Sequence, residues 1–236
     1  MYDPQNSYKM TIKDATILFF ASLILGWAIA QTHPKLSDPM ALGEATIKAQ
    51  QIDTPTQINV QNKVALFIGD SHTSNHKQGW QKRLCDSVRF KMINASVGGK
   101  TTYWMIEQAV YKITDKVDYC FIYGGANDMY NSHITPQEAV DNIKAIARLC
   151  QHKAIKCIVL TGFDPVKCTR TPNKSYAGKY AKFQNLLLTQ YMEGAQVVDT
   201  RVVDRRDCWD ELCHMAPSGH KKIAEKVIKD LGFEKI

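Results

Sequence analysis

The fold is decided by the stretch VALFIGDSHT, residues 64–73. A run of apolar residues stops at a Gly-Asp-Ser sequence, after which the chain becomes polar. Such a run is typical of a strand that is buried on both faces of a parallel sheet. Because ligands bind beyond the carboxyl ends of parallel strands, we expect Ser71 to lie at a ligand-binding edge. A serine after a strand also commonly forms a turn or caps a helix, so Ser71 needs partners elsewhere in the chain.

The same kind of apolar run recurs along the chain and alternates with helical patterns. The strand-like runs are 64–69, 89–94, 118–124, 156–162 and 195–199. The helical patterns lie near 76–87, 102–115, 136–151, 175–192 and 217–231. Short apolar runs separated by amphipathic helices indicate a parallel sheet covered on both faces. The sequence therefore predicts a three-layer α/β/α sandwich with a mainly parallel, five-stranded sheet.

The part of the chain before this pattern is organised differently. Residues 1–14 are polar, and residues 15–30 (ATILFFASLILGWAIA) carry no charge. This apolar helix has the length of a signal-peptide core or a short signal anchor, and Ala28-Ile29-Ala30 resembles a cleavage pattern. We expect an anchor that places the remaining chain outside the cytoplasm; a cleaved signal peptide would make the protein secreted. Residues 31–60 read as a proline-containing linker, and residues 61–236 as the α/β domain.

Composition restricts the possible partners. The 236 residues are 44% hydrophobic, enough for a substantial core, and the formal net charge is +7. The densest charged run, residues 201–206, includes aspartates and is typical of a solvated face. Aromatic residues are not interleaved with basic ones, so we expect no nucleic-acid binding.

The seven cysteines all follow residue 80. Cys120 and Cys157 lie in apolar runs and are expected to be buried thiols. Cys168, Cys208 and Cys213 lie in loop-like sequence and can form a disulfide if the domain is exported. The odd total leaves at least one cysteine unpaired within the chain.

Four polar segments are predicted to meet at one edge of the sheet. Three of them, residues 69–71, 94–102 and 124–128, follow the first three strands. The fourth, residues 210–220, precedes the last helix and can reach the same edge. Loops that follow parallel strands open on one edge, so these segments should converge.

The convergence supplies the groups that acyl transfer by a serine requires. His214 can take the proton of the Ser71 hydroxyl, and a carboxylate three or four residues earlier can orient its ring. The backbone N–H groups of Ser71 and Gly99, with the side-chain amide of Asn127, can donate to an oxyanion.

Together these segments resemble the SGNH hydrolases, also called the GDSL family of esterases and lipases. The resemblance rests on Gly69-Asp70-Ser71, on Asn94 followed five residues later by Gly99, on Gly125-Ala126-Asn127-Asp128, and on His214 followed by Gly219. It covers roughly residues 62–234 in the family's order. It implies a flavodoxin-like fold and a serine esterase without a metal or an organic cofactor.

The chain departs from the family at the acid. The family has an aspartate three residues before the histidine, where this chain has Glu211, and Asp210 lies four before. The spacing favours Glu211 as the residue that orients His214, and a local bulge would let Asp210 serve instead.

The resemblance also suggests a substrate class. The Gly-Asp-Ser-His variant is similar to domains linked to O-acetyl transfer on surface polysaccharides. We therefore expect an O-acetyl ester on a carbohydrate as substrate. The alternatives are an O-acyltransferase that uses the same residues, and a glycan- or protein-binding module without turnover.

Two local patterns have other interpretations. Gly98-Gly99-Lys100-Thr101 resembles the end of a phosphate-binding P-loop but lacks that motif's first glycine, because Asn94 stands at its position. His72 and His76 are four residues apart without a carboxylate or cysteine nearby, so we interpret them as polar residues at a helix start and not as metal ligands.

Overall fold

The computed structural model describes residues 57–74, 77–130, 133–164, 167, 174–209 and 214–236. The predicted polar segment 1–14 and apolar helix 15–30 lie outside these ranges, as does most of the linker 31–60. Within the described ranges, none of the helices combines the length and the apolar character that crossing a membrane requires.

A five-stranded sheet forms the centre of the domain, and all its neighbouring strands run parallel. In chain order the strands are β1 (Val64–Gly69), β2 (Lys91–Asn94), β3 (Tyr119–Tyr123), β4 (Lys156–Leu160) and β5 (Ala195–Val198). Their order across the sheet is β2-β1-β3-β4-β5. The predicted parallel α/β sheet is confirmed, and the apolar run that precedes Ser71 forms an inner strand, β1.

The second strand differs from its prediction. The apolar run 89–94 suggested a buried strand, but β2 is limited to Lys91–Asn94 and lies at the edge of the sheet. Met92 and Ile93 are each 40% exposed. Hydrophobic periodicity reports the element type but not the strand order, so it could not distinguish this edge strand from an inner one.

The helices agree with the helical patterns to within a few residues. They are α2 (Trp80–Val88), α3 (Thr102–Lys112), α5 (Pro136–His152), α7 (Lys174–Thr189) and α8 (Pro217–Asp230). The sequence did not predict the short helix α4 (Ala126–Tyr130) or the 3-10 helix η1 (Arg205–Asp207).

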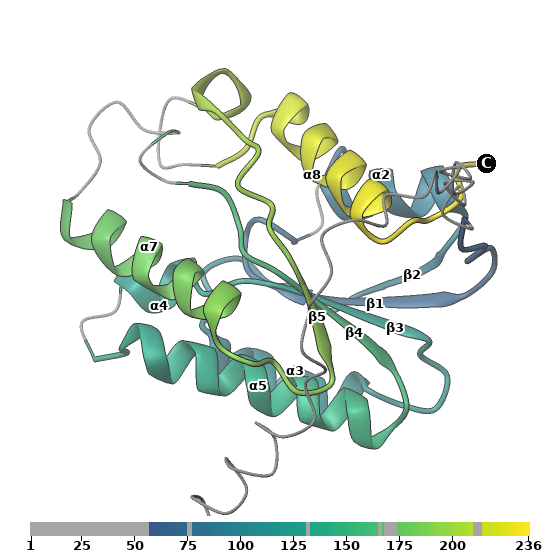
Figure 1. The fold of residues 1–236 in the computed structure, drawn as a ribbon, viewed down its shortest axis with the longest axis horizontal. Helices are drawn as coiled ribbons and strands as arrows, with labels where there is room; N and C mark the ends of the chain where they lie inside the picture. Colours follow the sequence, from purple (N-terminus) through teal and green to yellow (C-terminus); the bar gives the residue numbers. More distant parts are fainter. Residues whose placement is uncertain (1–56, 75–76, 131–132, 165–166, 168–173, 210–213) are drawn as a thin grey trace, which may run out of the picture. The chain divides into compact units, whose positions relative to one another are not determined.

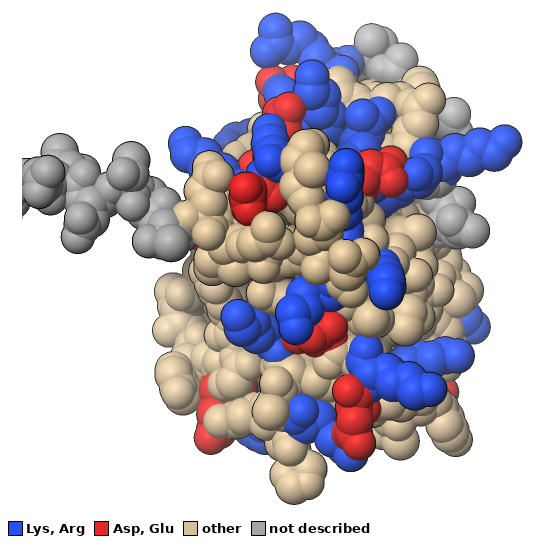
Figure 2. Space-filling view, turned by 90° about the vertical axis from the view of Figure 1, so that its right-hand side faces the viewer, with Lys and Arg blue, Asp and Glu red and all other residues tan. Residues whose placement is uncertain are grey.

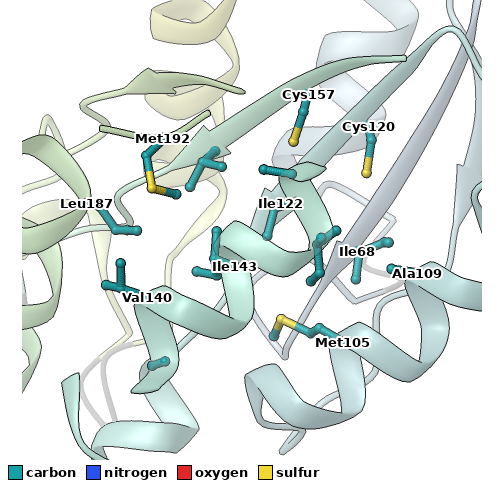
Figure 3. Close-up of a cluster of buried hydrophobic side chains, with 14 of the residues drawn as sticks. Ile68, Met105, Ala109, Cys120, Ile122, Val140, Ile143, Cys157, Leu187 and Met192 are labelled. Atoms are coloured by element: carbon teal, nitrogen blue, oxygen red, sulfur yellow. The ribbon is translucent and has the colours of Figure 1, made fainter. Parts of the chain in front are cut away.

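The helices cover the two faces of the sheet (Figure 1). Phe67 points to the face covered by α2 and α8, whereas Leu66 and Ile68 point to the face covered by α3, α5 and α7. This alternation is the two-residue period of a strand that is buried on both sides. Figure 3 shows the second of these cores, where Ile122 of β3 lies near Ile143 of α5.

In the described ranges, the cysteines for which the sequence predicted an environment lie in that environment. Cys120 and Cys157 are buried free thiols in the core of Figure 3, as expected. Cys208 forms a disulfide. Cys168 and Cys213 lie outside the described ranges, so the predicted pairing among the loop cysteines stays a prediction.

Candidate active site

Ser71 lies on a tight turn directly after β1. The backbone N–H groups of Thr73 and Ser74 both donate to the carbonyl oxygen of Asp70, at 3.1 and 2.8 Å. Gly69 is required at the strand end, because a Cβ there would lie 2.2 Å from the carbonyl oxygen of Tyr123. This turn leaves the Ser71 side chain half-buried at the carboxyl edge of the sheet.

His214 meets Ser71 from the other end of the sequence. Its Nε2 lies 3.0 Å from the Ser71 Oγ, although 143 residues separate the two. The segment is fixed by an antiparallel bridge between Cys208 and Met215, and by the N–H of Trp209, which donates to the His214 carbonyl oxygen at 2.8 Å. The 3.0 Å separation between the Ser71 Oγ and the His214 Nε2 is a hydrogen-bonding distance for a hydroxyl and the base that takes its proton.

The acid that would orient His214 falls outside the described part of the chain. Residues 210–213, which include both Asp210 and Glu211, have no described placement. The choice between these two carboxylates therefore stays a prediction.

The glycine-rich segment approaches Ser71 from β2. A Cβ on Gly98 would lie 3.6 Å from the Ser71 Cβ, so the backbone of Gly98 packs against the serine. The N–H of Gly99 is one peptide bond away, and Gly99 has φ +77° with open space around its Cα. The left-handed φ favours glycine at position 99, whereas a Cβ at position 98 would make an ordinary van der Waals contact with Ser71.

Asn127 reaches the same segment from α4, the short helix after β3. Its Nδ2 donates to the carbonyl oxygen of Lys100 at 3.0 Å. An amide nitrogen carries two N–H donors, so this contact fixes the side chain while the second N–H stays available to a ligand.

Three further side chains connect the loops around Ser71. Asn94 donates through Nδ2 to the carbonyl oxygen of Thr73 at 3.0 Å, which ties the second segment to the first. The buried carboxylate of Asp128 accepts from the N–H of Thr102 at 3.0 and 3.1 Å and from its hydroxyl. These hydrogen bonds hold the start of α3 against the third segment.

His72 was interpreted wrongly from the sequence. It lies on the turn after β1 and not at a helix start, and it is buried, with its ring 5.7 Å from the ring of Tyr123 and 4.8 Å from that of Phe163. It also lies 5.2 Å from the ring of His214. The sequence signal for this burial was the position of His72, directly after Ser71 on the turn that ends a buried strand. His76 lies outside the described ranges.

Asp70, the residue before Ser71, carries a fully buried carboxyl group. Its Oδ1 accepts the N–H of His72 at 2.9 Å, and its Oδ2 has no hydrogen-bond partner in the described part of the chain. Desolvation raises the pKa of Asp70 from 3.8 to about 7, and the nearby charge of Asp128 adds to this increase.

This pKa predicts a pH dependence of stability. Between about pH 4 and pH 7 the folded protein holds a proton on Asp70 that the unfolded chain has lost, so the unfolding free energy falls as the pH rises. Between pH 5 and pH 8, urea unfolding should show a loss of unfolding free energy that is about 2–3 kcal/mol larger in the wild type than in Asp70→Asn.

The matched control is Asp118→Asn. The N–H of Val64, with Lys63, lowers the pKa of Asp118, so the stabilisation from Asp118 is lost only at acid pH. This variant should keep the wild-type loss between pH 5 and pH 8. An unchanged loss in Asp70→Asn would contradict the assignment to Asp70.

Among the described residues, no group of three or more histidine, cysteine, aspartate or glutamate side chains is arranged to hold a metal ion.

One family model matches the chain. The model of the GDSL-like lipase/acylhydrolase family matches residues 67–222, which is more than half of the chain. No curated protein matches the chain.

Several solved structures share the fold at low sequence identity. An acetylxylan esterase from Geobacillus stearothermophilus has a TM-score of 0.60 and 15% identity, covering 75% of this chain and 98% of its own. The acetyl xylan esterase AlAXEase has a TM-score of 0.60 and 16% identity, covering 71% and 100%. A GDSL-family lipolytic protein from Veillonella parvula has a TM-score of 0.58 and 14% identity, covering 71% and 97%.

Two mutants of the same Geobacillus esterase also share the fold. One replaces a tryptophan, and another, a catalytic mutant, replaces the aspartate that directly follows that tryptophan.

Proposed function

Since this chain belongs to the GDSL-like lipase/acylhydrolase family and is an ester-hydrolysing serine hydrolase, we propose that it removes O-acetyl groups from a carbohydrate, with Ser71 as nucleophile. The observation that carries the proposal is the 3.0 Å contact between the Ser71 Oγ and the His214 Nε2. It lies at the edge of the sheet where parallel α/β folds bind ligands.

The chemistry follows from these groups in two stages. The Ser71 Oγ attacks the acetyl carbonyl carbon while its proton passes to the His214 Nε2. The tetrahedral intermediate collapses, the carbon–oxygen bond to the sugar breaks, and His214 returns the proton to the leaving sugar oxygen. Water then attacks the acetyl-serine with His214 as base, which releases acetate and restores Ser71.

The oxyanion of each tetrahedral intermediate needs hydrogen-bond donors. We assign this role to the N–H groups of Ser71 and Gly99 and to the Nδ2 of Asn127. The packing of Gly98 against Ser71, and the Asn127–Lys100 hydrogen bond, support this assignment. Donors already fixed in position need no reorganisation as charge develops.

Asn127→Ala should lower kcat by about 10²–10³-fold and change KM little, because an oxyanion donor acts mainly in the transition state. Steady-state kinetics on p-nitrophenyl acetate measures both. The matched control is Asn185→Ala, which removes an exposed amide from α7 and should leave kcat unchanged. A loss of less than about threefold in Asn127→Ala would exclude it as a donor.

The order of residues near His214 supports Asp210 as the orienting acid. Trp209 directly precedes Asp210, as a tryptophan precedes the catalytic aspartate of the Geobacillus esterase. Glu211, which has the family's spacing to His214, is the alternative.

An acetyl group on a carbohydrate is supported by two observations. Two of the structures with a similar fold are acetylxylan esterases. In addition, Gly69-Asp70-Ser71-His72 resembles domains that act on O-acetyl groups of polysaccharides. The second observation equally favours an O-acyltransferase, in which a sugar hydroxyl replaces water as acceptor.

We also propose that the domain, which follows the apolar segment 15–30 in the sequence, lies outside the cytoplasm. The disulfide of Cys208 supports an oxidising compartment.

An ester panel tests the proposed function. The wild type should have a kcat/KM on p-nitrophenyl acetate at least about tenfold above that on the butyryl and decanoyl esters. It should release acetate from acetylated xylo-oligosaccharide, and Ser71→Ala should do neither. Transfer of acetyl to added sugar without acetate release would favour the transferase, whereas a preference for decanoyl esters would contradict an acetyl substrate.

A further inference from the structure

The chain enters the domain at the edge opposite Ser71. Ile58 pairs with Phe233 in a parallel bridge, and its N–H donates to the carbonyl oxygen of Gly232 at 2.7 Å. Glu234 returns a hydrogen bond to the Ile58 carbonyl at 3.0 Å. These residues lie at the edge of the sheet where the strands begin, which we call the amino edge. Ser71 lies at the opposite edge, the carboxyl edge, where the strands end.

The amino edge carries exposed cations that lack acidic partners. Among its charged side chains, Lys63 pairs with Asp118 at 3.0 Å and Lys153 with Asp115 at 3.3 Å. The exposed cations of this edge without a carboxylate partner among the described residues are Arg89, Lys91, Lys112, Lys116, Lys156, Lys229 and Lys235. Figure 2 looks onto this side, and Lys and Arg clearly outnumber Asp and Glu there.

An apolar hollow lies within this basic surface. Its volume is about 310 Å³, and its lining includes Tyr119, Ile158, Leu231 and Phe233. Lys156 also lines it, with its Nζ 3.4 Å from the Tyr119 hydroxyl and 5.3 Å from the centre of the Tyr119 ring. A surface that is both cationic and apolar matches an amphiphile better than a uniformly polar polyanion.

We propose that the amino edge rests on a lipid bilayer with anionic headgroups. Each basic side chain close to such a surface adds to the attraction, and the hollow can take apolar lipid atoms beside Lys156. The sequence adds a second argument, because the apolar segment 15–30 precedes the domain and leads to this same edge at Ile58. If segment 15–30 inserts into a bilayer, it tethers the domain to that bilayer.

This orientation specifies how substrate arrives. Ser71 and His214 lie at the carboxyl edge, so they face away from the bilayer and accept substrate from the aqueous side. This point rests on the proposed function, and it favours a glycan over the lipids of the supporting membrane. The docking itself depends only on the amino edge.

Hydrogen exchange of the full chain tests the docking. The protein is placed in nanodiscs of phosphatidylcholine alone, and of phosphatidylcholine mixed with phosphatidylglycerol. In the anionic discs, amides of residues 57–63 and 113–118 should exchange at least about fivefold more slowly, and high salt should remove the difference. Loops at the carboxyl edge, residues 95–101, should exchange alike in both.

Charge reversal supplies the matched comparison. Lys91→Glu/Lys116→Glu should lose the protection, whereas Lys77→Glu/Lys182→Glu, two exposed lysines away from the amino edge, should keep it. Equal exchange in both kinds of disc, or protection of residues 95–101 instead, would overturn the proposal. Turnover of p-nitrophenyl acetate in the same discs reports the esterase separately, so the two proposals can fail independently.

Discussion

Replacing Ser71 by alanine is expected to lower kcat/KM on p-nitrophenyl acetate by at least about 10⁴-fold. The variant removes the atom that attacks the carbonyl, and the His214 Nε2 that lies 3.0 Å from it then has no hydroxyl to deprotonate. The residual rate comes from substrate binding and the oxyanion donors alone. Steady-state kinetics with purified protein measures the loss.

Ser74→Ala is the matched control for this variant. Ser74 belongs to the same turn, and its hydroxyl donates only to the Ser71 carbonyl oxygen at 3.2 Å among the described hydrogen bonds. It should retain turnover within about threefold, because it removes no reacting atom. Comparable turnover of Ser71→Ala and the wild type would mean that another residue is the nucleophile.

The second large effect should come from one of the two carboxylates before His214. Asp210→Asn is expected to lower kcat by about 10⁴-fold, because an amide cannot stabilise the imidazolium and favours the wrong tautomer of the ring. Glu211→Gln should change kcat by less than about tenfold if Asp210 orients His214.

Asp210→Asn and Glu211→Gln are controls for each other, because each removes one negative charge and the two positions are adjacent. The reverse pattern, with the large loss in Glu211→Gln, would assign the acid to the family's usual spacing. Small losses in both variants would show that His214 acts without a carboxylate partner from this segment, which would contradict the proposed triad.

The sequence predicted the site through the fold. Once five apolar runs indicated a parallel sheet, the loops after the strands had to open on one edge. The sequence therefore predicted that Ser71, Gly99 and Asn127 lie at one edge of the sheet. It also predicted that the distant segment with His214 reaches the same edge. The 3.0 Å contact between Ser71 and His214 agrees with that prediction.

Features that depend on spatial neighbours could not be predicted. The exposed strand β2 is one, because periodicity does not encode its place at the sheet edge. The burial of His72 between Tyr123 and Phe163 is another, because these aromatic residues come from two later strand ends. Similarly, only the fold shows that Gly98 is the glycine that packs against Ser71.

Labelling with a fluorophosphonate tests the central claim most directly, because such reagents modify a serine only when a base activates it. Mass spectrometry of the full-length protein should find one stoichiometric adduct, located on Ser71, with labelling slowed by at least about 10³-fold in His214→Ala. No adduct on the wild type, or an adduct at another residue, would contradict the assignment of Ser71 as an activated nucleophile.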